Sequence, residues 1–262
     1  MTISENPSAV NGQSAPVNAF DTWAAAGFTT ELLPVIPPDG ELVSGSNIKR
    51  SARGKTPGFR KGGKWRGFTW QKSSATTDQL KEWSRTNASV GLQARGHPGV
   101  DIDVKDETVS VALGAMAETM LGAAPERIGQ KPKRLLTYKL AQGADPIKKR
   151  KVTFKLPGAE TWHAVEILGR GQQFVVAGVH PVTNRPYIWT NGSPASWGRE
   201  ALTPITADAI DAFMGAVEAE VERLGGTVIA RKGQGGADAG TVRGQAGLQG
   251  DKERVREALE AL

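Results

Sequence analysis

Apolar and polar residues alternate along several short stretches of this chain, and such alternation is typical of strands that bury one face. The clearest stretch is 99–104, Gly-Val-Asp-Ile-Asp-Val. Its three β-branched residues would face a core, while Asp101 and Asp103 share the opposite face. The same reasoning predicts further strands at 32–38, 88–93, 134–140, 151–156, 162–168, 173–177 and 187–189.

A spacing of three to four residues between apolar positions predicts helices at 22–27, 77–83, 107–121 and 206–224. The last is the strongest, because Thr206 suits an N-cap and an apolar stripe runs from Ile210 to Leu224. Two glycines then end it.

Two turns predict hairpins between consecutive strands. The turn at 95–99 would join strand 88–93 to strand 99–104. The Gly-Arg-Gly turn at 169–171 would join strand 162–168 to strand 173–177.

The composition divides the chain into four parts. Residues 1–19 are rich in Ser, Asn, Pro and Gly and are expected to be disordered. Residues 20–226 hold the periodic segments and form the predicted folded domain. Residues 227–250 are Gly-rich and are expected to be a flexible linker. Residues 251–262 begin a charged amphipathic helix that ends abruptly, which indicates that a longer natural protein continues into a further helical region.

Several classes of protein are excluded or disfavoured by composition. The chain has no cysteine, so disulfides and thiolate metal sites are excluded. Its three histidines are scattered and too few for a histidine-based zinc site. No apolar run approaches the roughly 20 residues that cross a bilayer, and the N-terminus lacks the pattern of a secretory signal. We therefore expect a cytoplasmic protein with no membrane partner.

Basic residues are concentrated in two blocks of a chain whose net charge is +6. Residues 49–72 hold nine Lys or Arg and no acid, and residues 131–155 hold nine more against one Asp. Such blocks suit a polyanion, although solvated loops are the alternative interpretation. Aromatic residues interleave with the first block, which suits base stacking. The candidate DNA-binding residues are Lys55, Arg60, Lys61, Lys64, Arg66, Lys148, Lys149 and Arg150.

Asp101 and Asp103 are the first candidates for chemistry. Two carboxylates side by side repel each other unless a cation lies between them. Mg²⁺ or Mn²⁺ is the usual solution, because hard cations prefer carboxylate oxygens. A solvated strand face is the alternative.

Glu166 is a third candidate acid, because it lies mid-strand between Val165 and Ile167. A lone carboxylate in an apolar strand is costly unless it is paired or metal-bound. With Asp101 and Asp103 it would complete a three-carboxylate site for one or two divalent metal ions. The alternative is a salt bridge from Glu166 to Lys139 or Arg170.

Several ordered motifs make the chain resemble a known family. Gly-Lys-Thr-Pro at 54–57 is followed by a Thr-Asp-x-x-x-x-Trp helix and by Val-Gly-Leu at 90–92, which leads into the Asp-x-Asp strand. Val-Glu-Ile at 165–167, Val-Val-Ala at 175–177, His180-Pro181 and Tyr187-x-Trp189 come later. In this order, from about residue 20 to 189, they resemble the Prim-Pol (bifunctional DNA primase/polymerase) domain of the archaeo-eukaryotic primase superfamily, as found in phages and plasmids.

The resemblance implies a fold and a set of site residues. The fold would be α/β (α+β), an RNA-recognition-like, mostly antiparallel sheet with flanking helices. Asp101, Asp103 and Glu166 would be catalytic and would hold Mg²⁺ or Mn²⁺. A family histidine that touches the nucleotide phosphates falls on Lys139, where lysine retains the charge but not the ring. With Lys139, we assign His180, Arg134 and Arg170 to the nucleotide.

The function that follows is template-directed nucleotidyl transfer in phage or plasmid DNA replication. The expected partners are single-stranded template DNA, primer–template and nucleoside triphosphates, with a host-cytosol location if the protein is viral. A helicase or primer-binding region would follow in a longer chain, as in longer relatives. The alternatives are a catalytically silent single-strand DNA-binding or replication-initiation module, and a metal-dependent nuclease.

Overall fold

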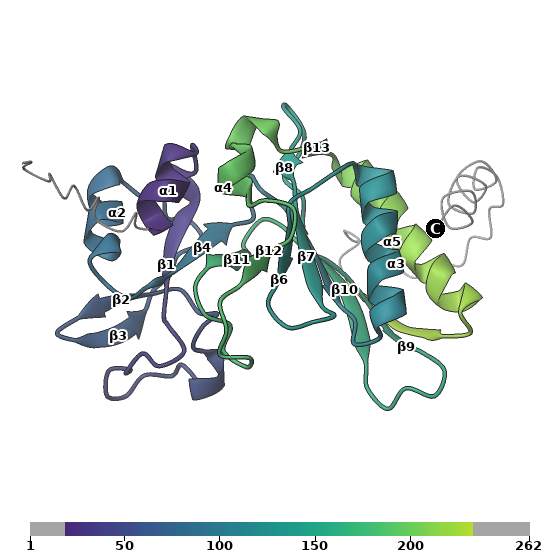
Figure 1. The fold of residues 1–262 in the computed structure, drawn as a ribbon, viewed down its shortest axis with the longest axis horizontal. Coiled ribbons are helices and arrows are strands. Elements are labelled where there is room, and N and C mark those ends of the chain that lie inside the picture. The colour runs from purple at the N-terminus through teal and green to yellow at the C-terminus, as the bar shows by residue number, and fades with distance from the viewer. Residues whose placement is uncertain (1–18, 233–262) are drawn as a thin grey trace, which may run out of the picture.

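Seven strands form the central sheet, in the order β12-β6-β7-β5-β10-β9-β14, and each neighbouring pair in it is antiparallel (Figure 1). The computed structural model describes residues 19–232. The strands of this sheet are β5 (Gly99–Asp103), β6 (Glu126–Ile128), β7 (Arg134–Thr137), β9 (Arg150–Lys155), β10 (His163–Leu168), β12 (Ile188–Trp189) and β14 (Thr227–Lys232).

Two helices, α3 (Glu107–Leu121) and α5 (Ala207–Arg223), cover one face of this sheet, side by side (Figure 1). The inward residues of β5, β9 and β10 meet them in the larger hydrophobic core, which includes Ile102, Phe154 and Val165. Asp106 and Thr206 cap the two helices by accepting hydrogen bonds from the backbone of their first turns. The alternating strands thus bury one face and leave the acidic face outside this core.

A smaller sheet, in the order β1-β4-β11, carries the second core. Its strands are β1 (Leu32–Val35), β4 (Ser89–Gln93) and β11 (Gln173–Ala177). Helices α1 (Ala19–Ala25) and α2 (Thr77–Ser84) pack with it, and α2 begins with a capping box formed by Thr76 and Gln79. Leu135 and Leu168 of the central sheet belong to this second core, so it covers part of the acidic face.

The remaining elements are short. A hairpin of β2 (Gly58–Lys61) and β3 (Lys64–Gly67) lies at the lower left of Figure 1. The pair β8 (Lys139–Leu140) and β13 (Pro204–Ile205) is parallel and lies at the top, near α4 (Pro194–Trp197). The single-turn 3-10 helices are η1 (Thr29–Glu31), η2 (Arg50–Ala52) and η3 (Arg199–Ala201).

The α+β class and the mostly antiparallel pairing are confirmed. Both predicted hairpins are wrong: β4 and β11 lie in the smaller sheet, whereas β5 and β10 lie in the central sheet and pair with each other. Each turn carries the chain from one sheet to the other. The similarity to a primase core and to an RNA-recognition sheet stays a prediction.

Residues 227–232, predicted as the start of the linker, instead form β14 and pair with β9. The expected disorder before residue 19, the rest of the linker and the final helix lie outside the described residues. Within residues 19–232, no helix is both long and apolar enough to cross a membrane.

Candidate active site

Asp101 and Glu166 are direct partners in the register of β5 and β10. Asp103 pairs with Ala164 in the same ladder, so the three carboxylates share one face of the central sheet. This is the face that α3 and α5 leave uncovered. The side chain of Glu166 is 18% exposed and that of Asp103 is 54% exposed.

A cavity of about 350 Å³ lies over these acids. The central sheet, the smaller sheet and the segment after β11 all contribute to its wall. Its lining residues are Lys55, Asp101, Asp103, Arg127, Gly129, Gln130, Lys133, Arg134, Leu135, Glu166, Leu168, Gln172, Gln173, Phe174, Val175, His180 and Tyr187.

The surroundings of Asp101 change the pKa of its carboxyl group. Burial raises its pKa to about 6, because the charged form loses hydration. The nearby charge of Arg127 opposes this rise, while Asp103 and Glu166 add to it. Among residues 19–232, no hydrogen bond or ion pair of Asp101 is found, so its oxygens remain available to a ligand.

Arg127, on β6, brings a buried cation to the same cavity. Its guanidinium lies 4.4 Å from the ring centroid of Tyr187 and donates a hydrogen bond from Nη1 to the carbonyl of Val175. Its Nε is buried without a hydrogen-bond partner in the described structure. Burial lowers its pKa, and Tyr187 and Asp101 act against that shift.

Lysines hold the other two acids. Lys133 Nζ lies 2.7 Å from Asp103 Oδ1. Lys149 Nζ lies 2.7 Å from Glu166 Oε1, and Lys151 Nζ lies 3.7 Å from Oε2. Salt bridging of Glu166 was the alternative expected from the sequence, but its partners are these two lysines and not Lys139 or Arg170.

The chemistry of the three acids fits a divalent cation, because three carboxylates share one face and no group among residues 19–232 donates a hydrogen bond to Asp101. Their present orientation does not gather them: among residues 19–232, no group of three or more His, Asp or Glu side chains is placed to hold a metal ion. Metal binding by all three would require Asp103 and Glu166 to turn away from their lysines.

The other predicted nucleotide-binding residues divide into two groups. His180 and Arg134 line the cavity. His180 accepts backbone hydrogen bonds at Nδ1 from Val182 and Thr183, and burial lowers its pKa. Arg134 is paired with Glu126 at 2.7 Å.

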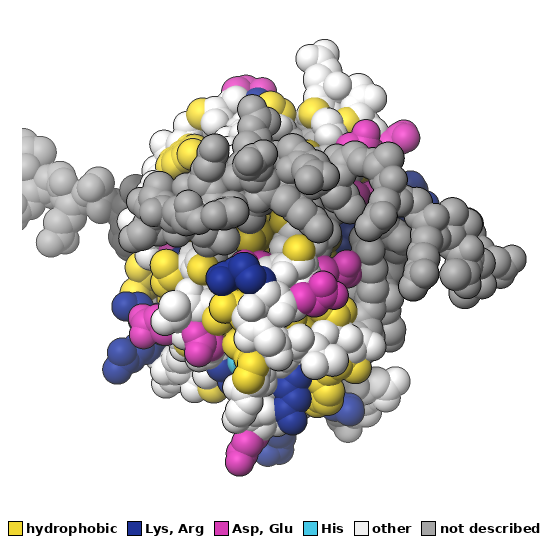
Figure 2. All heavy atoms as spheres, turned by 90° about the vertical axis from the view of Figure 1, so that its right-hand side faces the viewer, with side chains coloured by type: hydrophobic (Ala, Val, Ile, Leu, Met, Phe, Trp, Pro, Cys, Tyr) yellow, Lys and Arg dark blue, Asp and Glu magenta, His cyan; other side chains and the backbone are white. Residues whose placement is uncertain are grey.

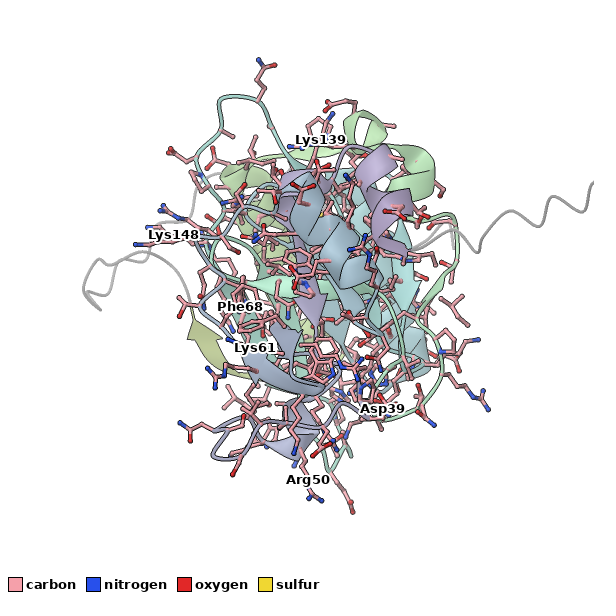
Figure 3. The ribbon with its side chains drawn as sticks, turned by 90° about the vertical axis from the view of Figure 1, so that its left-hand side faces the viewer. Asp39, Arg50, Lys61, Phe68, Lys139 and Lys148 are labelled. Carbon is pink, nitrogen blue, oxygen red and sulfur yellow. The ribbon has the colours of Figure 1, made fainter. Side chains whose placement is uncertain are left out.

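Lys139 and Arg170 do not line the cavity. Lys139 donates a 2.6 Å hydrogen bond to the carbonyl of Glu200, and Figure 3 shows it near the top of the molecule, at the end opposite Arg50. The register partner of Asp101 on β7 is Leu135, which lines the cavity as Arg134 does. Lys139, the cation predicted to lie beside the acids on this strand, is therefore not next to them.

The predicted DNA-binding residues are also dispersed. Lys55 lines the cavity, and Lys149 reaches it through Glu166. Arg150 instead pairs with Asp211 of α5 at 2.8 Å, on the covered side of the sheet. The hairpin β2–β3 carries Arg60, Lys61, Lys64 and Arg66, and Lys148 lies in the loop before β9 (Figure 3). On the face seen in Figure 2, basic and acidic side chains of the described residues are interspersed.

Sequence reasoning missed Arg127, Lys133 and Gln172 as site residues. Arg127 and Lys133 lie between the predicted helix 107–121 and the predicted strand 134–140, where no element was predicted. Gln172 Nε2 donates a 2.9 Å hydrogen bond to Glu166. No local signal marked Arg127, because Glu126 and Arg127 are consecutive charged residues without the alternation of a strand. Tyr187 was noted only as a motif residue.

The fold and this cavity define a mixed α+β protein in which three acids and buried Arg127 of the central sheet meet uncharged residues of the smaller sheet in one cavity. The chain belongs to the Prim-Pol family: the model of the bifunctional DNA primase/polymerase N-terminal domain matches residues 22–206. No curated protein gives a significant match. The family indicates DNA primase and polymerase activity, with DNA and nucleotides as partners.

Proposed function

We propose that this protein is a template-directed nucleotidyltransferase whose reaction takes place in the cavity over Asp101. A 3′-hydroxyl attacks the α-phosphate of a nucleoside triphosphate in line, and pyrophosphate leaves. The observation that carries the proposal is the meeting of three carboxylates with buried Arg127 in one cavity of a Prim-Pol domain.

The carboxylates of Asp101, Asp103 and Glu166 would hold one or two Mg²⁺ or Mn²⁺. Bound there, the metal would lower the pKa of the attacking hydroxyl and neutralise charge on the triphosphate. The ammonium groups of Lys133 and Lys149 are the present counter-ions of Asp103 and Glu166. Released from these acids, they can pair with phosphate oxygens instead.

Arg127 would orient the triphosphate. Its position is restrained by Val175 and Tyr187, so it does not have to be ordered when the anion arrives. A buried guanidinium is also a strong partner for phosphate, because its planar donors match two oxygens at once. Positioning and charge neutralisation would supply most of the rate.

The proposed setting is phage or plasmid DNA replication, in the cytoplasm of the cell or of the host. A helicase or primer-binding region of a longer chain is a proposed partner of this domain. Priming from single strands and extension of a primer are both within the proposed chemistry.

The test is extension of a labelled primer on a template, with Mg²⁺ or Mn²⁺ and either nucleotide set. The variant Asp101→Asn should lose incorporation by more than about 100-fold, because it removes one charged ligand. Asp78→Asn on α2 is the control, since Asp78 is exposed and its only ion pair in the described structure is with Lys81. Near-normal extension by Asp101→Asn would contradict the proposal.

One observation favours a second candidate. The lysine pairs at Asp103 and Glu166 would also suit a silent DNA-binding module, in which the acids only balance charge. Such a module would bind DNA without metal-dependent synthesis. A nuclease using the same acids would degrade DNA in the absence of nucleotides, which the same assay detects.

A further inference from the structure

Trp162 is an exposed aromatic residue to which the proposed reaction gives no role. It lies just before β10 and is 56% exposed. It belongs to neither hydrophobic core. Its only ring contact in the described structure is Lys155 of β9, whose Nζ lies 5.8 Å from the ring centroid.

The register places Trp162 on the same face as the acids. Side chains alternate along β10, so Trp162 shares a face with Ala164 and Glu166. In the paired strand β9, Lys151 is opposite Glu166 and Thr153 is opposite Ala164, so Lys155 falls beside Trp162. A row of side chains therefore leads from the acidic cavity to the tryptophan, over roughly 13 Å of strand.

This row is polar or basic and partly open to solvent. Residues 151, 153 and 155 are half-buried to exposed, whereas Val152 and Phe154 between them are fully buried against the helices. Lys149 and Lys151 are both paired with Glu166, so the three groups together carry one positive charge in excess, and Lys155 adds another. The ring of Trp162 supplies a flat apolar surface at the end of the row. We call Lys149, Lys151, Lys155 and Trp162 the β9–β10 shelf.

We propose that the β9–β10 shelf holds single-stranded DNA, with one unpaired base stacked on Trp162 and the backbone along the lysines. The charge of the row suits phosphates, and the exposed ring suits a base, since base–aromatic stacking is tolerant of sequence. The proposal deepens the proposed function, because the strand on the shelf would be the template entering the cavity.

The opposite face of the sheet offers no such row. Within residues 19–232 it is covered by α3 and α5, whose charged side chains are acidic apart from Arg223 at the end of α5. A flexible strand is thus attracted to the acidic-cavity side by its lysines and not to the helical side.

The test measures binding of a fluorescent single-stranded oligonucleotide to the full chain, without metal or nucleotide. Trp162→Ala should weaken binding by about 5- to 100-fold, the effect of losing one stacked base. Trp162→Phe should restore most of it, because the ring is retained. Val111→Ala on α3 is the control, as Val111 is similarly exposed on the covered side of the sheet.

An oligonucleotide made of abasic sites separates stacking from charge. Wild type and Trp162→Ala should bind it equally, whereas Lys155→Ala should weaken binding to both oligonucleotides and reduce the salt dependence by about one counter-ion. Equal binding of the normal oligonucleotide by wild type and Trp162→Ala would overturn the shelf. So would an equal loss on the abasic strand.

The outcomes for the shelf and for the proposed function are distinguishable. A protein that binds as predicted but never extends a primer refutes the nucleotidyl transfer and leaves the shelf supported. A protein that extends primers, with an unchanged KM for template in Trp162→Ala, refutes the shelf alone. If Trp162→Ala changed the KM for nucleotide and left the KM for template unchanged, the shelf would also be overturned, because the ring would then contact the incoming base.

Discussion

The guanidinium of Arg127 lies over the ring of Tyr187, 4.4 Å from its centroid, at the edge of the acidic cavity. The ring of His180 packs edge-on against the same Tyr187 ring, with 5.3 Å between the two ring centroids. Tyr187 and His180 thus hold the guanidinium of Arg127 near Asp101. Its Nε has no hydrogen-bond partner in the described structure and stays free to donate to a ligand.

We therefore expect Arg127→Met to raise the KM for nucleotide by about 10- to 100-fold, because a charge-assisted hydrogen bond to phosphate is lost. Steady-state extension kinetics would measure it. Tyr187→Phe keeps the ring and should stay close to wild type. An unchanged KM in Arg127→Met would show that the guanidinium does not contact the triphosphate.

Gly129 leaves room for this cluster. A Cβ placed there would lie 2.5 Å from Tyr187 Cε1 and 2.8 Å from His180 Cδ2. Gly129→Ala should therefore displace both rings and lower the extension rate by about tenfold or more, while the fold remains intact. Gly96→Ala is the matched control, because nothing lies within 4 Å of its Cβ position. Primer-extension assays would compare the rates of the two variants, and circular dichroism would check that both are folded. Equal extension rates would contradict the prediction.

Under the proposed function, Lys133 would compete with metal for Asp103, since it lies 2.7 Å from that carboxylate. Lys133→Met should increase the affinity for Mn²⁺ several-fold, and Asp103→Asn should decrease it. Titration calorimetry with Mn²⁺ alone gives this readout without any catalytic assay. Lys81→Met, which breaks an exposed pair with Asp78, is the control. Tighter Mn²⁺ binding in Asp103→Asn would exclude Asp103 as a ligand.

His97 makes folding sensitive to acid. It is 1% exposed, its Nδ1 has no partner in the described structure, and burial lowers its pKa to about 3, with Arg199 and Lys139 adding to the shift. The unfolded chain binds a proton near pH 6.5, but the folded chain does not. Stability from this group is therefore complete above pH 6.5 and falls towards pH 3, by up to about 1.4 kcal/mol per pH unit.

Urea unfolding at pH 6.5 and pH 5.0 would measure this effect. The wild type should lose about 2 kcal/mol more between these values than His97→Leu does. The comparison uses the difference between two pH values, so any packing cost of the substitution at Phe28, whose ring lies 4.9 Å away, cancels. Parallel losses in the two proteins would show that His97 titrates normally.

The sequence predicted local structure better than long-range arrangement. Periodicity located α3 and α5, and alternation placed Asp101, Asp103 and Glu166 on one face, as the register shows. Their metal-binding role stays a prediction. The hairpins failed, because a turn such as 169–171 has the same local chemistry whether its strands pair or separate into two sheets.

The cations of the site could not be assigned from the sequence for a related reason. Lys139 follows the alternation of strand 134–140, yet the chain leaves the central sheet after Thr137 and pairs with β13. Arg127 reaches Asp101 only because β6 is ordered beside β7 and because Tyr187, sixty residues later, packs on it. Such neighbours are set by tertiary packing, which no local pattern encodes.

The cavity has walls from two separately packed cores: Asp101 and Glu166 come from the central sheet, and Phe174 and Val175 from the smaller one. The chain crosses between them at Gly169, where a Cβ would lie 2.2 Å from the carbonyl oxygen of Ile147. This crossing is only three residues beyond Glu166. Partial separation of the two cores would therefore open the site while each core remained folded. A ligand that protects the protein from proteolysis at low denaturant concentration would then do so by holding the two cores together, and not by preventing global unfolding.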